Sequence, residues 1–450
     1  MDLLILSRIQ FAITAMFHFI YPPMSIGLGL IILIMESMYM VTQKPLYHRM
    51  TKFWVKMFGL NFAIGVASGI VMEFEFGTNW STYSRYVGDV FGSALAAEGV
   101  FAFFLESGFL AILLFGWDKV SARMHWISAL LVCLGAHFSA VWIIVAGSWM
   151  QTPAGFHIVG QGLTARAEIT DFWALVFNPS SMERLAHVLV AAWLTGAFFV
   201  LSVSAYYLLH KRHVEFAKVS MRVALIVALI AAVGQMVTGR ISAETVARYQ
   251  PAKLAVMEGN FPANEPAGVY LFGYVDEKAQ KVNGPQIPGL LSYLVNGDAS
   301  KPVAGIKSFK KEDLPPINIV FQTYHFMITI GVLLFLLTII CFVYLKQGKL
   351  FETPWLLKIL VPAVLLPQFA NQLGWMTAEI GRQPWIVYGL LRTSQGLSKA
   401  IQANVVLTSL IMFTFIYLLL FVLYIYLFDS KIKLGPVDGE QDLLHGHRAD

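Results

Sequence analysis

Nine long apolar segments dominate this 450-residue sequence and limit what it can fold into. A helix of about 20 apolar residues, rising 1.5 Å per residue, crosses the ~30 Å hydrocarbon core of a bilayer. The segments lie near residues 11–40, 54–76, 93–117, 126–150, 185–209, 218–240, 319–345, 355–379 and 404–428. A transmembrane barrel would show shorter segments of alternating polarity. The sequence therefore predicts an all-α fold, a polytopic membrane bundle of about nine transmembrane helices.

Composition agrees with a membrane protein and limits its partners. Charged residues make up 13% of the chain, about half the fraction found in soluble domains. The formal charge of +5 could suggest nucleic acid, but a multi-pass protein reaches such a value by carrying Lys and Arg on one face. The two cysteines, Cys133 and Cys341, lie inside apolar segments, which excludes a disulfide framework or a CxxCH haem attachment. We expect a lipid bilayer, and no nucleic acid, among the partners.

The distribution of Lys and Arg predicts the orientation of the helices. Positive residues are more frequent in every second connection, namely "KPLYHRMTK", "WDKVSARMH", "HKRHVEFAK" and "KQGKLFETPWLLK", and again at Lys431 and Lys433. Connections of this kind stay in the cytoplasm. We predict a periplasmic N-terminus and a cytoplasmic C-terminus, with residues 77–92, 151–184, 241–318 and 380–403 on the outer side.

Three parts follow from this pattern. Residues 1–240 contain the first six helices, and residues 319–450 contain the last three helices and a cytoplasmic tail. Between them, residues 241–318 form a polar connection with eight of the 18 prolines and seven glycines. A connection of this length without obvious regular structure is usually functional or disordered.

Ionisable side chains at membrane depth are costly and become functional candidates. Together with one methionine, the informative residues are His18, Glu73, Glu75, Glu98, Glu106, His137, His187, His325, Met327 and Glu379. Glu73 and Glu75 could be interfacial carboxylates without a chemical role. For His137 we expect a satisfied interior histidine.

A histidine and a methionine on separate helices form a possible axial pair for a low-spin haem iron. His18, His187 and Met327 are candidates, but a lone buried His also hydrogen-bonds neighbouring helices and a lone Met fills cores. His325 and Met327 are two residues apart and point to nearly opposite sides of a helix, so only one can bind a given iron. The bare pattern leaves both interpretations open.

Glu98 and Glu106 lie in one spanning segment, "ALAAEGVFAFFLESGF". Their separation of eight residues places them on roughly adjacent faces of a helix, ~12 Å apart along its axis. Two such carboxylates could relay protons through intervening water. The alternative is a pair of hydrogen bonds to neighbouring helices.

Several longer strings resemble a known family. "LSRIQFAITAMFHF", "MTKFWVKMFGLNFAIGVASGIVMEFEFGTNWSTYSRYVGDVFG", "AFFLES", "GSWMQTP" and "AEIGRQPW" occur in this order. They closely resemble subunit I of cytochrome bd ubiquinol oxidase, a bacterial terminal oxidase of the inner membrane. The resemblance runs through nearly the whole chain and is weakest in the long outer connection and the C-terminal tail.

The resemblance implies three haems and assigns their ligands. His187 and Met327 correspond to the axial ligands of a low-spin haem b. His18 corresponds to a ligand of a high-spin haem, with haem d preferred, and Glu379 to the ligand of the other high-spin haem, a haem b. Arg382 would neutralise a haem propionate, although a lipid phosphate or a carboxylate is an alternative partner.

The resemblance also implies a route for electrons and protons. Glu98 corresponds to the carboxylate beside the oxygen-reducing haem and Glu106 to the next member of a proton route from the cytoplasm. The string "PAKLAVMEG" supplies Lys253 and Glu258 of a quinol-binding loop of the short kind. On bare sequence these two would be an ordinary solvated pair. One departure is His325, where the family usually has arginine, which puts the potential of the low-spin haem in question.

The expected function is therefore quinol oxidation at the outer face and reduction of O2 to water with cytoplasmic protons, which generates proton motive force without pumping. The resemblance implies subunit II as a partner, often together with a small single-helix subunit, and ubiquinol or menaquinol as substrate. Two alternatives remain. A quinol-linked di-haem cytochrome would lack oxygen chemistry and carry only low-spin haem b, and a secondary transporter would carry no haem.

Overall fold

The computed structural model describes residues 2–263 and 265–436, so the predicted tail beyond residue 436 lies outside the described residues. Within them, nine helical segments are long and apolar enough to cross a membrane. They are Leu3–Thr42, Pro45–Thr78, Gly88–Phe115, Ala122–Gln151, Ser181–Leu209, Val214–Tyr249, Ile317–Lys346, Pro354–Ile380 and Ala403–Leu434. Each predicted segment falls within or largely overlaps one of these, which confirms the all-α membrane fold.

Three of the nine segments are interrupted where the sequence predicts continuous helices. The first consists of α1 (Leu3–His18) and α2 (Tyr21–Thr42). The third consists of α5 (Gly88–Glu98), a π-helical turn (Gly99–Phe103) and α6 (Phe104–Phe115). The eighth consists of α14 (Pro354–Leu360), a 3-10 turn (Pro362–Val364) and α15 (Leu365–Ile380). The first break follows His18, and the second follows Glu98.

The break between α1 and α2 has a local cause. Pro22 and Pro23 occupy the first turn of α2, where proline is tolerated because the first amides of a helix have no intrahelical acceptor, although α1 cannot continue through them. The first span starts at Leu3 rather than near residue 11, and His18 is the last residue of α1.

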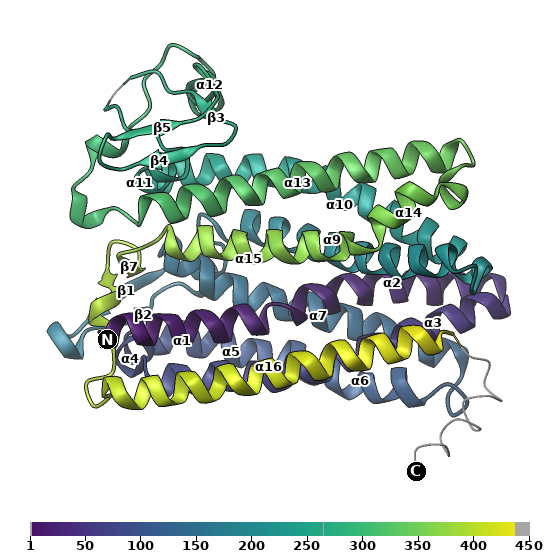
Figure 1. The fold of residues 1–450 in the computed structure, drawn as a ribbon. Helices are drawn as coiled ribbons and strands as arrows, with labels where there is room; N and C mark the ends of the chain where they lie inside the picture. Colours follow the sequence, from purple (N-terminus) through teal and green to yellow (C-terminus); the bar gives the residue numbers. More distant parts are fainter. Residues whose placement is uncertain (1, 264, 437–450) are drawn as a thin grey trace.

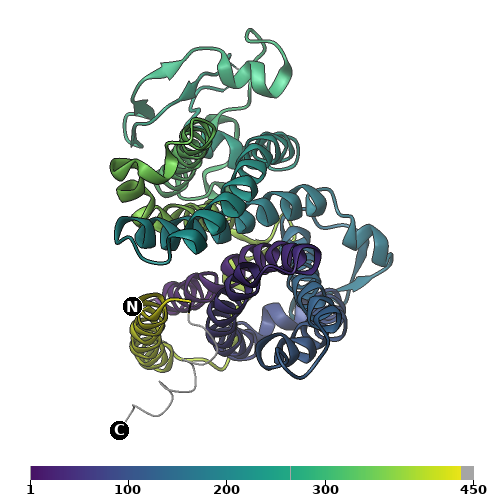
Figure 2. The same ribbon diagram turned by 90° about the vertical axis from the view of Figure 1, so that its right-hand side faces the viewer.

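The helices lie side by side, as Figure 1 shows. The remaining long helices are α3 (Pro45–Thr78), α7 (Ala122–Gln151), α9 (Ser181–Leu209), α10 (Val214–Tyr249), α13 (Ile317–Lys346) and α16 (Ala403–Leu434). Seen along the helices in Figure 2, those of the first 150 residues and α16 form the lower part, and α10 and α13 lie in the upper part. Helix α9 joins the two parts because it packs against both α2 and α10.

Two glycines allow α2 and α9 to approach closely. A methyl group on Gly27 would lie 2.1 Å from the Ala192 carbonyl oxygen, and one on Gly196 would lie 2.3 Å from the Gly27 carbonyl carbon. Backbones in contact over small residues are a common way for membrane helices to associate.

The four connections predicted on one side of the membrane lie at one end of the bundle (Figure 1). They contain α4 (Ser81–Tyr86), the hairpin of β1 (Phe156–Val159) and β2 (Arg166–Ile169), α8 (Phe172–Val176), and the hairpin of β7 (Trp385–Val387) and β8 (Leu391–Arg392). Helix α1 begins at this end and α16 ends at the other (Figure 1).

The long connection is a small folded unit. Helix α10 continues to Tyr249, past the predicted boundary at residue 240. The unit then contains α11 (Pro251–Met257), β3 (Val269–Tyr270), β4 (Tyr274–Asp276), β5 (Lys281–Asn283), β6 (Gln286–Ile287) and α12 (Leu290–Asn296). Leu254, Val256, Val275 and Leu291 share a core with Phe321 of α13. The described residues 250–263 and 265–316 therefore form a folded unit anchored on α13, so of the two alternatives, functional or disordered, the disordered one is wrong for them.

Candidate functional site

Helix α15 lies at the centre of the candidate ligands. Its Asn371 donates to Thr195 Oγ1 of α9 (3.0 Å), while Gln368 and Gln372 donate to the carbonyl oxygens of Ile20 and Met16 (3.2 and 2.8 Å) at the break after α1. These carbonyls are free to accept because α1 ends there. The break thus brings Met16 and Ile20, two residues before and two residues after His18, into contact with α15.

Met327 faces α15 from α13. A methyl group on Gly374 would lie 3.1 Å from Met327 Sδ, so the glycine leaves this sulfur atom room. His325 faces the other way: its Nδ1 lies 2.8 Å from the Phe321 carbonyl oxygen, and its Nε2 lies 2.9 Å from the Tyr270 carbonyl oxygen of β3. The expected opposite orientation of His325 and Met327 is confirmed.

His187 lies on α9 and faces α10. Its Nδ1 is 3.0 Å from Thr238 Oγ1, and its Nε2 is 2.9 Å from Gln235 Nε2. Gly239 leaves room here, since a methyl group on it would lie 3.6 Å from His187 Cε1. Helices α9, α10, α13 and α15 pack against one another, so His187 and Met327 come from one group of neighbouring helices.

The packing around this group suits a large flat ligand. Only Pro367 and Thr377 are buried among the 16 residues of α15, although it packs against both α9 and α13. The side-chain oxygens of Gln235, Gln368 and Gln372 are buried and find no hydrogen-bond partner in the described chain. Because α15 is partly exposed on every side, there is room for a ligand between it and its neighbours. A His and a Met are suitable axial ligands for a low-spin haem iron. The residues present fit a haem.

His18 ends α1 opposite α3. Its Nδ1 lies 3.0 Å from Ser68 Oγ, and a methyl group on Gly69 would lie 3.2 Å from its Cε1. About two turns further along α3, Glu75 is 2% exposed and accepts a hydrogen bond from Thr14 Oγ1 (2.6 Å). The interfacial interpretation is wrong for Glu75, whereas Glu73 is exposed.

Glu98 and Glu106 both face α7. Ser139 donates to Glu98 Oε1 (2.9 Å), and a methyl group on Gly135 would lie 2.9 Å from Glu106 Cβ. Gly135 and Ser139 are four residues apart and share one side of α7. The π-helical turn between the two glutamates shifts the register that a regular helix would give, so the Glu98 carboxylate and the base of the Glu106 side chain meet the same side of α7. Such turns are frequent at functional sites.

Glu379 forms the end of α15 and has two polar partners. Arg382 donates to both of its carboxylate oxygens, to Oε1 at 3.5 Å, and Gln151 Nε2 lies 3.2 Å from the same Oε1. The Arg382 side chain is 5% exposed and the Glu379 side chain 34% exposed. In this structure the partner of Arg382 is therefore a carboxylate of the same chain. The contact with a haem propionate remains a prediction.

Lys253 and Glu258 are buried, at 3% and 4% exposure, so they are not a solvated pair. Lys253 Nζ donates to the Ala378 carbonyl oxygen (2.9 Å), directly before Glu379. Burial, and next the Arg184 guanidinium, hold the pKa of Lys253 well below its usual range. Tyr324 OH donates to Glu258 Oε1 (2.8 Å), and burial raises the pKa of Glu258 to about 7 despite this bond.

Gln151 joins these groups, and the sequence did not single it out. Besides the contact of its Nε2 with Glu379, Gln151 accepts two hydrogen bonds at Oε1. One comes from Lys253 Nζ (3.4 Å) and the other from Gln250 Nε2 (3.0 Å). Its place at the end of a spanning helix, in "GSWMQTP", was the available signal. The end of α7 thereby links α11, which carries Lys253, with the end of α15.

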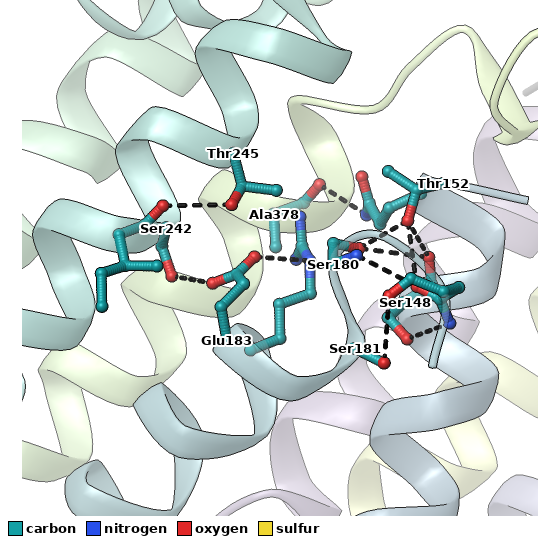
Figure 3. A network of polar contacts seen from close by, with 12 residues as sticks. Ser148, Thr152, Ser180, Ser181, Glu183, Ser242, Thr245 and Ala378 are labelled. Atoms are coloured by element: carbon teal, nitrogen blue, oxygen red, sulfur yellow. Dashed lines mark hydrogen bonds and ion pairs between the residues drawn. The ribbon is translucent and has the colours of Figure 1, made fainter. Parts of the chain in front are cut away.

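Two further charges near Lys253 were also missed. Figure 3 shows Glu183 pointing toward Ser242 of α10, which donates a hydrogen bond to its carboxylate. Arg184 Nε lies 3.8 Å from Glu183 Oε1. Beside them, the Thr152 and Ser180 hydroxyls lie 2.7 Å apart, and Ser180 Oγ donates to the Ser148 carbonyl oxygen (3.5 Å), which joins α7 to the start of α9 (Figure 3). Glu183 and Arg184 follow "NPSSM" at the edge of their apolar segment, where a carboxylate and a guanidinium look like an ordinary interfacial ion pair.

Two interior histidines have hydrogen-bond partners at their ring nitrogens. His137 Nδ1 lies 2.7 Å from the Cys133 carbonyl oxygen and accepts from Trp193 Nε1 at its other nitrogen (2.9 Å), which confirms a satisfied interior histidine. His125, which the sequence did not single out, lies 2.8 Å from Glu36 Oε1, and both are buried at the end of the bundle opposite Lys253.

Comparisons with known proteins agree with the resemblance. A family model described as cytochrome bd terminal oxidase subunit I matches residues 6–436. Cytochrome bd ubiquinol oxidase subunit 1 of Bacillus subtilis (strain 168) is 41% identical over 446 residues, covering 97% of this chain and 94% of that protein. Cytochrome bd-II ubiquinol oxidase subunit 1 of Escherichia coli (strain K12) is 35% identical over 503 residues, covering 97% of each.

The fold agrees as well. The structure of the bd oxidase from Geobacillus thermodenitrificans matches with a TM-score of 0.88 at 28% identity, covering 97% of this chain and 99% of that chain. Since the family model and both relatives span nearly the whole sequence, the chain belongs to the family of cytochrome bd terminal oxidase subunit I.

Proposed function

We propose that this chain is the haem-bearing subunit of a quinol:oxygen oxidoreductase. It oxidises quinol at the outer face, reduces O2 to water with protons taken from the cytoplasm, and so generates proton motive force without pumping. The observation that carries the proposal is that Lys253 and Glu258, both buried, meet the ends of the two helices that carry Glu379 and Met327.

The family is haem-containing, and the finer assignment of the haems to residues is part of the proposal. His187 and Met327 would hold a low-spin haem b, His18 haem d, and Glu379 a high-spin haem b. When bound, these groups supply one-electron transfer and oxygen binding. The chain contributes the ligands and the glycines beside them, namely Gly69, Gly239 and Gly374.

Quinol oxidation releases protons, and Glu258 is placed to accept one. Its Oε2 is buried without a hydrogen-bond partner among the described residues, so one carboxylate oxygen is free to receive a proton. With a pKa of about 7, Glu258 is ionised in about half of the molecules at neutral pH, close to the optimum for a general base. Lys253 would hold a quinol oxygen, since its amino group is buried in the same outer unit as Glu258.

Protons for water would travel from the cytoplasm through Glu106 and then Glu98. Both side chains lie against the side of α7 that carries Gly135 and Ser139, so a proton could pass between them along one helix face with water in between. Arg382 would position Glu379 and neutralise a haem propionate. Each of these roles follows the resemblance and the contacts given above.

The chain is a multi-pass protein of the bacterial inner membrane, since its relatives are bacterial and nine of its described helices can span a bilayer. We propose that the end carrying residues 250–316 is periplasmic, which places the N-terminus outside and the C-terminus in the cytoplasm. Subunit II of the same oxidase, and a small single-helix subunit, would pack against its apolar faces.

A matched pair of lysine variants tests this function. In the purified complex, Lys253→Gln should lower quinol-driven oxygen consumption at least tenfold, because the buried Lys253 Nζ contacts both Ala378 and Gln151. Lys301→Gln, an exposed lysine in the same unit, is the control and should leave the rate unchanged. Equal rates for the two variants would show that Lys253 does not serve quinol oxidation.

A further inference from the structure

A groove of about 510 Å³ lies between α10 and α13 at the end of the bundle opposite residues 250–316. Lys218 and Arg222 of α10 and Lys346 at the end of α13 line it, together with Phe351 and Glu352 from the following turn. The groove is remote from the candidate haem and quinol residues, which lie on other helices or near the opposite ends of these two.

The three cations of this groove have aromatic partners but no ion pair. Lys218 Nζ and the Arg222 guanidinium lie 5.7 and 5.0 Å from the Phe351 ring centre, and Lys346 Nζ lies 5.4 Å from the ring centre of Phe342. No described carboxylate lies within ion-pair distance of any of them. By contrast, Arg240, near the other end of α10, pairs with Glu244 at 2.9 Å.

The charges of the groove do not cancel. Three positive side chains face one carboxylate, Glu352, among the lining residues. Three positive charges less one negative charge leave the groove with a net charge of two positive. Unpaired cations beside low-dielectric surface are stabilised by an anion, because neither the protein nor the hydrocarbon solvates them well.

An apolar strip continues from the cations toward the middle of the membrane. Ile226, Ile230, Val233 and Val237 follow Arg222 at helical spacing, and their side chains are 53%, 60%, 48% and 56% exposed. Arg222 lies eight residues after the start of α10 at Val214, which corresponds to about 12 Å along the axis. The cations therefore lie nearer the end of the bundle, and the exposed apolar strip of the same helix face lies nearer the middle of the membrane. A lipid would match this arrangement, with its headgroup at the cations and its acyl chains along the strip.

We propose that this groove binds an anionic phospholipid whose headgroup carries two phosphates, as in the cardiolipin class. The phosphates would contact Lys218, Arg222 and Lys346, and two acyl chains would lie along the strip from Ile226 to Val237. Two phosphates match the two unbalanced positive charges, whereas a headgroup with one phosphate would leave one charge unmatched. Basic pockets between membrane helices on the cytoplasmic side commonly take such headgroups.

The test titrates the purified, delipidated complex with tetraoleoyl cardiolipin and follows binding by native mass spectrometry. Each Lys or Arg near an anionic lipid contributes about fivefold in affinity, so Lys218→Gln together with Arg222→Gln should weaken binding about 25-fold. Arg240→Gln removes a paired cation from the same helix and should leave the affinity unchanged. Haem absorbance checks that each variant is assembled, and Lys346→Gln alone, expected to weaken binding about fivefold, replaces the double variant if that one does not assemble.

Dioleoyl phosphatidylglycerol and inorganic phosphate distinguish the sources of the anion. Weaker binding of phosphatidylglycerol, and no displacement of cardiolipin by inorganic phosphate, would support the proposal. Equal affinity of wild type and double variant would overturn it, as would displacement by inorganic phosphate alone. A co-purifying single-helix polypeptide seated on the groove, with no lipid bound there, would also overturn it.

Discussion

The hydrogen bond from Tyr324 to Glu258 makes a sharp prediction about pH. Tyr324→Phe removes the hydroxyl that donates to Glu258 Oε1 at 2.8 Å. A hydrogen bond to an ionised group contributes about 1.5–3 kcal/mol, which corresponds to about 1–2 pKa units. Because this bond stabilises the ionised carboxylate, its loss should raise the pKa of Glu258 from about 7 to about 8 or 9.

The consequence for turnover follows from the ionised fraction. If Glu258 accepts a quinol proton, only the ionised form is active, so the rate rises with pH through its pKa. At pH 7 the ionised fraction should fall from about one half to about one tenth or less, a loss of at least about fivefold. The loss should shrink as the pH approaches 9.

The assay is oxygen consumption by the purified complex at saturating quinol between pH 5.5 and 9. Tyr293→Phe is the control, since Tyr293 is in the same outer unit and 58% exposed, and its profile should match wild type. A rising limb that stays in place in Tyr324→Phe, or moves to lower pH, would refute the role of Glu258 as the proton acceptor.

Four further variants test separate parts of the account. Met327→Leu should convert the low-spin haem to a high-spin or lost species in the reduced spectrum, and an unchanged spectrum would reject the ligand. Glu379→Ala should perturb a high-spin haem and spare the low-spin one; retention of all haems and of activity would contradict this. Glu106→Gln should slow oxygen reduction more than tenfold while quinol still reduces the low-spin haem, and normal turnover would exclude it from the proton route. Gly196→Ala should destabilise the complex by about 1–3 kcal/mol by pushing α9 from α2, seen as faster thermal inactivation than in Gly331→Ala, where a methyl group meets nothing within 4 Å.

The number and location of the spanning helices could be predicted because hydropathy reports the length of an apolar segment directly. The breaks inside a segment could not be predicted in this way, because they leave the hydropathy of the segment unchanged. The run around His18 stays apolar through Phe19, Ile20 and Tyr21, so only Pro22 and Pro23 signalled that α1 ends there. The π-helical turn after Glu98 has no residue signal at all, and with it the shared orientation of Glu98 and Glu106 was missed.

The contacts between polar residues far apart in the sequence could not be predicted either. Gln151 lies at the end of its helix, where a polar residue ordinarily meets water, and only packing brings it to Glu379, 228 positions away. In the outer unit the strands are two or three residues long, too short for a periodic pattern. The resemblance supplied the candidate functional residues, and the fold accounts for why Lys253 and Glu258 are buried rather than solvated.

The central claim is that this chain holds both quinol-side and oxygen-reducing haems. A reduced-minus-oxidised absorption spectrum of the purified complex, recorded with and without carbon monoxide, tests it most directly. The account predicts a low-spin haem b signal together with a chlorin band in the red that shifts with carbon monoxide. A spectrum with low-spin haem b alone and no response to carbon monoxide would contradict it.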